Sequence, residues 1–201
     1  MKKLISFVMV MCFAMPNLVS AQDVANDYKF YVGGAIGFTQ NFYDGNTTTS
    51  NLTLMPELGY NINDKLSVGL DLGYTRDTDK YDKGDGSVDL HKTMFIVRPY
   101  VRYAFYRNER VNIFCDGGLS YVHTNKEQYG GSGKYDSKSN GFEVGLYPGI
   151  SYRISSRFSL VAHLGSLAYA SAKPDYDGAK STSTFGLSLA NGTSFGLYLH
   201  F

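Results

Sequence analysis

The chain has little cysteine, no tryptophan and no long apolar run, and these shortages exclude several classes of protein. Among its 201 residues only Cys12 and Cys115 are cysteines, so a disulfide framework does not hold the fold together. Beyond residue 21 no apolar stretch reaches the ~18 residues that a membrane-spanning helix needs. The formal net charge is only +1, so the chain lacks the basic surface that binds nucleic acid. We therefore expect neither membrane helices nor a nucleic-acid partner.

The first 21 residues have the pattern of a secretory signal. Lys2 and Lys3 precede an apolar run over residues 4–15, and Val19-Ser20-Ala21 provides small residues suited to cleavage. The sequence thus predicts a signal peptide over residues 1–21 and a mature domain over residues 22–201. That domain has 17 basic and 18 acidic residues, a net charge of −1, and one cysteine.

Strict alternation of apolar with small or polar residues is the main pattern of the rest of the chain. Residues 54–62 and 66–74 both alternate with period two and are separated by a turn at Asn63-Asp64, so they predict a β-hairpin. A proline followed four residues later by a tyrosine marks the first arm, at Pro56 and Tyr60. The same signature returns over residues 99–103 and 148–152, which indicates a repeated hairpin.

Eight such strands account for the whole mature domain. In the seventh strand the alternation changes phase, which predicts a bulge near Ser166. We favour one long last strand over an extra hairpin at Asn191-Gly192, because a ninth strand would give an odd count. The predicted strands cover about residues 28–41, 52–62, 66–76, 93–106, 111–121, 141–154, 158–170 and 183–201.

The connections alternate between long and short. Polar segments of about 8, 14, 18 and 11 residues, near residues 43–50, 77–89, 123–140 and 171–181, alternate with turns of about 2 to 4 residues. This asymmetry is typical of transmembrane barrels, whose long loops face outward and whose short turns face the periplasm. The sequence predicts an all-β fold, an eight-stranded antiparallel up-and-down transmembrane β-barrel. The acidic segment 77–89 lacks the spacing of a calcium loop, and we expect no metal or cofactor.

The two faces of the strands suit a barrel in lipid rather than in water. One face carries large apolar residues, and the other carries glycine, serine, threonine and a few charges, which are too small and polar for a soluble core. Tyrosines of the apolar face fall at strand ends and predict two aromatic girdles. These tyrosines are Tyr60, Tyr103 and Tyr152 before the short turns, and Tyr74 and Tyr121 before the long loops.

Six titratable side chains of the inward face fall at about one depth, counted from the short turns. They are Glu57, Asp71, Arg98, Arg102, Asp116 and His163. Because buried charges are strongly destabilising unless paired, we expect Arg98 and Arg102 to tie their strand to Asp71 on one side and to Asp116 on the other. The alternative is a wet lumen with independently solvated charges. The network is favoured because an eight-stranded barrel leaves little room inside.

With its signal peptide, alternating arms and C-terminal residues 197–201, the sequence resembles the small outer-membrane β-barrel proteins of the OmpA/OmpX type, the "porin family, outer membrane protein β-barrel" of Gram-negative bacteria. The resemblance implies export to the outer membrane and contact with its lipid. It also implies that Phe201, with Leu199 and Leu197, is the signal read by the barrel-assembly machinery.

The predicted role is structural or a surface interaction, in adhesion or envelope integrity, through four extracellular loops whose ligand the sequence does not name. One alternative is a narrow pore for small solutes. Another is an enzyme that modifies lipid, with His163 and Ser166 as base and nucleophile. A spacing of three places these two on opposite faces of a regular strand, so only a bulge brings them together. We expect no enzymatic activity.

Overall fold

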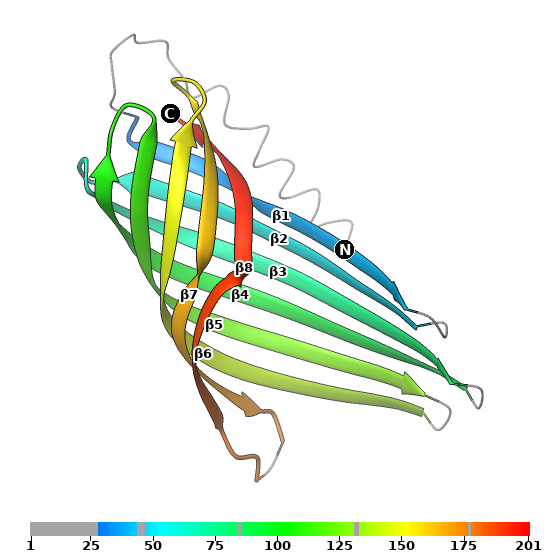
Figure 1. The fold of residues 1–201 in the computed structure, drawn as a ribbon. Helices are drawn as coiled ribbons and strands as arrows, with labels where there is room; N and C mark the ends of the chain where they lie inside the picture. Colours follow the sequence, from blue (N-terminus) through cyan, green and yellow to red (C-terminus); the bar gives the residue numbers. More distant parts are fainter. Residues whose placement is uncertain (1–27, 44–46, 84–85, 131–132, 177) are drawn as a thin grey trace.

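The computed structural model describes residues 28–43, 47–83, 86–130, 133–176 and 178–201, and the predicted signal peptide lies outside them. Each strand pairs antiparallel with its neighbour in the sequence, and the first pairs with the last, so the sheet closes into a barrel (Figure 1). This confirms the predicted eight-stranded up-and-down fold. No helix among the described residues is long and apolar enough to cross a membrane. The strands are β1 (Phe30–Tyr43), β2 (Thr47–Asn61), β3 (Leu66–Lys83), β4 (Gly86–Arg107), β5 (Val111–Gly130), β6 (Gly133–Arg153), β7 (Phe158–Pro174) and β8 (Thr182–His200).

The short turns are built by side chains that accept hydrogen bonds from the backbone that follows. Asn63 Oδ1 accepts from the amides of residues 65 and 66, both at 2.9 Å. Asn108 Oδ1 accepts from the amides of residues 110 and 111, at 2.9 and 2.6 Å. Such side chains supply the acceptor that a tight turn needs. The repeated hairpin of the sequence therefore ends each time in a similar turn.

The opposite ends of the hairpins differ from the prediction, because the strands continue where long loops were expected. Pairing between β3 and β4 runs to Lys83↔Gly86, and pairing between β5 and β6 runs to Gly130↔Gly133. The predicted loops over residues 43–50, 77–89 and 123–140 are therefore wrong for most of their length, and β7 extends into the loop predicted over residues 171–181. A change to polar side chains does not end a strand that lies in water, because the partner strand still provides the hydrogen bonds that its backbone N–H and C=O groups need.

The apolar face points outward, as predicted. Leu70 is 38% exposed, whereas the adjacent Asp71 is 4% exposed and faces the lumen. The outward apolar band covers eleven residues of β4, from Phe95 to Phe105, which matches the ~9–11 residues of a strand that crosses a bilayer. Beyond Phe95 the outward positions of β4 are polar, beginning with Thr93.

Pro56, Pro99 and Pro148 each fall where the ladder to the next strand is interrupted. Residues 55 and 56 lack a partner on β3, residues 98 and 99 lack one on β5, and residues 147 and 148 lack one on β7. On the other side each proline is paired, as in Leu70↔Pro99. Since proline has no N–H to donate, it sits where this donor is not used.

The phase change in β7 is a register shift between His163 and Gly165, next to the predicted bulge at Ser166. Gly165 has a φ of 139°, a backbone conformation that favours glycine. Strand β8 passes this point as one strand from Thr182 to His200, so the alternative hairpin at Asn191-Gly192 does not form.

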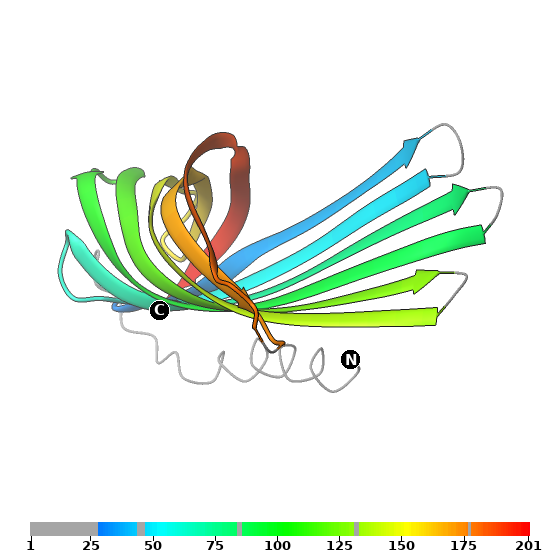
Figure 2. The same ribbon diagram turned by 90° about the horizontal axis from the view of Figure 1, so that it is seen from below.

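The ring closes through a short ladder between β1 and β8. Five residue pairs run from Tyr31↔His200 to Ala35↔Gly196, whereas β1 and β2 share fourteen. Two bonds of 2.9 Å between the backbones of Phe30 and Phe201 extend the closure toward the turns. Beyond Ala35, away from the short turns, β1 stays paired with β2, and β7 stays paired with β6 as far as Ser139↔Pro174. There β8 and β1 separate, and the end of the β7–β8 hairpin diverges from β1 (Figures 1 and 2).

We predict that Leu70→Arg lowers the free energy of unfolding from lipid vesicles by about 2–4 kcal/mol, because it places a charge on the lipid face near mid-depth. Denaturant titration followed by the gel shift of folded against unfolded protein measures the change. The matched control is Thr78→Arg, which also faces outward on β3 but lies beyond Tyr74, and it should be nearly neutral. Equal stability of Leu70→Arg and wild type would show that the faces are reversed.

Candidate functional site

The predicted lumen charges occupy the part of the barrel where the ring is closed. Glu57 pairs with Gly33, which in turn pairs with Tyr198 in the closure ladder. Arg102 reaches from β4 across the lumen, with its Nη2 3.0 Å from Glu57 Oε1 on β2. Its Nε and Nη2 also donate to the two oxygens of Asp116 on β5, at 2.7 and 2.8 Å. One guanidinium thus joins β2, β4 and β5.

The other predicted residues also contact one another, in two groups rather than one. Arg98 donates from Nε to Asp71 Oδ2 at 2.7 Å, and its Nη2 lies 2.5 Å from the same oxygen. His163 Nε2 lies 3.1 Å from Asp116 Oδ2, which adds β7 to the group around Arg102. The two arginines thus bind a carboxylate on each side of β4, Asp71 of β3 through Arg98 and Asp116 of β5 through Arg102. Glu57 was placed in the layer by the sequence, but its bond to Arg102 was not foreseen.

Four aromatic rings surround the Arg102 guanidinium, and sequence reasoning missed them. The guanidinium carbon lies 3.9 Å from the ring centre of Phe114, and between 5.2 and 5.5 Å from those of Tyr31, Tyr100 and Tyr198. Two of the tyrosines, Tyr100 and Tyr198, donate their hydroxyl hydrogens to the Glu57 carboxylate. The rings therefore exclude water from the ion pairs and add cation–π attraction to them.

Each of these rings stands opposite a glycine of the neighbouring strand. A Cβ atom built on any of these glycines would overlap the facing ring, so the small inward residues leave the volume that the rings fill. The sequence signal was present as large aromatics at inward positions among glycines. The cross-strand pairs are Tyr31↔Gly59, Tyr100↔Gly69, Phe114↔Gly149 and Tyr198↔Gly33.

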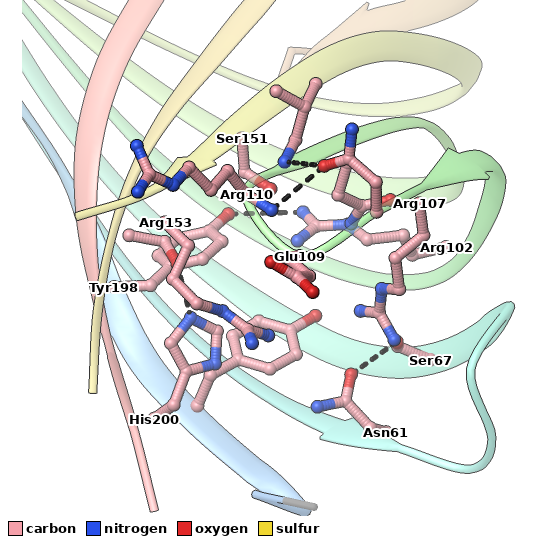
Figure 3. A pocket seen from close by; sticks show the side chains of 15 residues that line it. Asn61, Ser67, Arg102, Arg107, Glu109, Arg110, Ser151, Arg153, Tyr198 and His200 are labelled. Atoms are coloured by element: carbon pink, nitrogen blue, oxygen red, sulfur yellow. Dashed lines mark hydrogen bonds between the residues drawn. The ribbon is translucent and has the colours of Figure 1, made fainter. Parts of the chain in front are cut away.

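This layer divides the lumen into two hollows. The one on the turn side has a volume of about 40 Å³, and Figure 3 shows Arg102, Arg107, Arg153 and His200 around it. The one on the far side has a volume of about 200 Å³ and is bordered by Glu57, Arg98 and His163. Tyr198 lines both hollows, so a single layer of side chains separates them.

The arrangement does not resemble a catalytic triad. The bulge at Gly165 brings His163 and Ser166 to the wall of the same hollow, as the enzyme alternative required. His163 Nε2, however, is taken by Asp116, and no contact among the described residues joins His163 to Ser166. The described part of the chain also contains no group of three side chains that could hold a metal ion.

The remaining predicted residues lie on the outer surface. Phe201 stacks on Phe30 with ring centres 6.0 Å apart, and Leu199 and Leu197 belong to the closure ladder. The five girdle tyrosines occupy outward strand positions at the two ends of the apolar band. Two of them have aromatic neighbours at the far end, in the pairs Tyr74–Phe95 and Tyr121–Phe142, with ring centres 5.2 and 5.3 Å apart.

We predict that Arg102→Ala lowers the free energy of unfolding by about 3–5 kcal/mol, since it leaves two buried carboxylates without their cation. Adding Arg98→Ala should lower the denaturant midpoint further, because Arg98 belongs to a separate group. The control is Arg107→Ala at the rim, which should change stability by about 0.5 kcal/mol or less. An unchanged midpoint in Arg102→Ala would instead indicate independently solvated charges.

Comparison with known proteins places this fold in a family. The sequence profile described as "Outer membrane protein beta-barrel domain" matches residues 5–190. Among solved structures, the translocator domain of the autotransporter NalP from Neisseria meningitidis has a TM-score of 0.50 at 12% identity, over 92% of this chain and 67% of that one. The attachment invasion locus protein Ail of Yersinia pestis has a TM-score of 0.47 at 16% identity, over 86% of this chain and 97% of that one. Neisserial surface protein A has a TM-score of 0.43 at 17% identity, over 86% of this chain and 97% of that one.

A comparison with curated protein sequences gives no significant match. The family profile covers most of the chain, and the structural likeness to the NalP domain supports the same barrel architecture. The chain therefore belongs to the outer membrane protein β-barrel domain family, whose place is the outer membrane of Gram-negative bacteria.

Proposed function

We propose that this protein is a closed, non-conducting barrel that anchors long β-hairpins in the outer membrane, where they serve a structural or surface-interaction role. The observation that carries the proposal is the Arg102 layer, which fills the lumen where the ring is closed. We also infer that residues 1–21 direct export and that the barrel catalyses no reaction.

The Arg102 layer suits closure better than transport. A solute or ion that crosses it must separate Arg102 from Glu57 and Asp116 inside a dry ring of aromatic side chains. Breaking a buried pair without replacing it costs about 3–5 kcal/mol. A conducting channel would need a continuous path of water, which this layer interrupts.

The hairpins offer an exposed polar surface outside the apolar band. At the end of the β5–β6 hairpin, Lys134 Nζ lies 3.3 Å from Glu127 Oε1 and 3.1 Å from Asp136 Oδ2. Hydrogen bonds to Asp136 and Glu127 raise the pKa of Lys134, so it remains a cation. Exposed pairs of this kind contribute little to stability, and their charges can exchange partners with an incoming surface.

Trimming single hairpins tests the surface role. Replacing residues 126–137 by Asn-Gly joins Asn125 to Lys138, which are already paired, through a two-residue turn that suits a hairpin. Replacing residues 79–90 by Asn-Gly does the same for Thr78 and His91. We expect both variants to restore the detergent resistance of a strain lacking the protein, and at least one to lose attachment of cells to glass coated with serum proteins.

Two outcomes would contradict this division of roles. If cells attach as well as the wild type with both of the trimmed variants, the hairpins have no role in surface interaction. If neither variant restores detergent resistance, the structural role depends on the hairpins rather than on the closed ring. Conductance in planar bilayers tests the alternative of a narrow pore, and lipid-turnover assays test the alternative of a lipid-modifying enzyme. The wild type is expected to give no stable single-channel steps and no turnover of lipid A or phospholipid.

We propose that the barrel-assembly machinery reads the C-terminal strand through Leu197, Leu199 and Phe201. Deleting Phe201 should lower the amount of folded, heat-modifiable protein in the outer membrane, whereas Phe201→Tyr should retain it because the terminal ring remains. Phe201 also bonds to the backbone of Phe30, so the deletion variant is refolded from urea into detergent as a control for stability. Wild-type levels in cells carrying the deletion would refute the proposal.

A further inference from the structure

The barrel has a seam that is open in its outer half. From the short turns up to Ala35 and Gly196 the edges of β1 and β8 are paired. Farther from the short turns, neither of these two edges has a partner strand among the described residues. The first outward side chains beyond the ladder are Ile36 on β1 and Phe195 on β8, which are 74% and 73% exposed. Unpaired strand edges are costly in lipid, where no water satisfies them.

Along the two free edges the inward and outward side chains alternate in step, so the ladder between β1 and β8 can continue in the same register. The pair Ala35↔Gly196 is last, and the next step in the same register sets Ile36 opposite Phe195, with both side chains outward. The step after that sets Gly37 opposite Ser194, with both inward. Register in a sheet is fixed by such agreement of faces. The seam therefore has a paired state available as well as the open one.

The 200 Å³ hollow of the lumen ends at this seam. Its lining includes Ala35 and Gly196, the last pair of the ladder, and Ser194 just beyond it. The volume of about 200 Å³ is well above the ~10–15 Å³ that one water requires. A hollow with a mainly apolar lining and a few polar and charged side chains thus meets an apolar opening at the depth of the bilayer.

The groups around the hollow favour a ligand that accepts hydrogen bonds and has no net charge. The carboxylates of Glu57 and Asp71 are already bonded to Tyr100, Tyr198, Arg102 and Arg98. Two serines, Ser166 and Ser194, also line the hollow. Glu57, Asp71 and Arg98 are each paired with an opposite charge, so none of these lining groups is left free to bind an ion.

We propose that this hollow binds the head group of a single-chain, uncharged amphiphile, which enters sideways between β1 and β8. The head group accepts hydrogen bonds from the seryl hydroxyls. The acyl chain lies in the opening beside Ile36 and Phe195, where it covers the two free edges. Pockets of this kind combine an apolar lining with a few polar groups that orient the ligand.

The probe is a monoacylglycerol with a photoreactive diazirine in its acyl chain, used on the purified protein in lipid nanodiscs. We expect light-dependent labelling of β1 and β8 near Ile36 and Phe195. The test variant carries Ile36→Cys and Phe195→Cys in a Cys115→Ser background, so that oxidation closes the seam with a disulfide. Oxidation should reduce labelling by about tenfold or more because the side entrance is closed, and reduction should restore it in the same sample.

The matched control carries Val32→Cys and Leu199→Cys, a pair that lies within the existing ladder. Its disulfide should leave labelling unchanged. The proposal is overturned if the reduced protein is not labelled, if a complete Ile36–Phe195 cross-link leaves labelling unchanged, or if no cross-link forms within one chain. A cross-link between two chains would show that a second copy of the protein covers these edges instead.

Discussion

A buried guanidinium shared by two carboxylates is the constraint on which the barrel interior depends. Arg102 carries its charge out of water, and it is tolerated only because Glu57 and Asp116 surround it with oxygens. Asp116 is the cross-strand partner of Arg102 within the β4–β5 hairpin, whereas Glu57 lies on β2, so Arg102 also binds beyond its neighbouring strands. The four rings around the guanidinium keep the dielectric low, which strengthens these pairs. The inward glycines follow from the rings, since each ring needs the space that a Cβ would occupy.

This interior also compensates for the short closure ladder. Tyr31 of β1 and Tyr198 of β8 stack with ring centres 5.1 Å apart, and both belong to the cage of Arg102. Tyr31 shares a 2.6 Å hydrogen bond with Tyr100 of β4, and Tyr198 donates to Glu57 of β2. The two seam strands are thus bound to the opposite wall through the lumen. Five ladder pairs suffice because the seam is held from inside as well as along its edge.

Sequence reasoning recovered what depends on local periodicity and charge pairing. The strand count and the outward face around Leu70 follow from alternation. The expectation that the two arginines of β4 meet Asp71 and Asp116 follows from the cost of an unpaired buried charge. The aromatic cage was missed because the rings of Tyr31, Tyr100, Phe114 and Tyr198 converge only when distant strands meet. The hairpin extensions were missed for another reason. A run of polar residues was interpreted as the end of a strand. At the pair Asp77↔Lys92 such residues show only that both faces of the paired strands contact water.

The environment of each strand therefore changes along its length from lipid to water, while the backbone pairing with its neighbour continues. Within the apolar band a slip of one residue would turn Leu70 inward and Asp71 into lipid, so lipid and lumen fix the register together. Beyond Tyr74 on β3 and Phe95 on β4, the side chains no longer alternate between apolar and polar. The register there is held by backbone pairing and by the turn that joins the two strands. A change of side chain there alters the surface without a cost in burial. The same ladder can thus carry a rigid closed ring in the membrane and a replaceable surface above it.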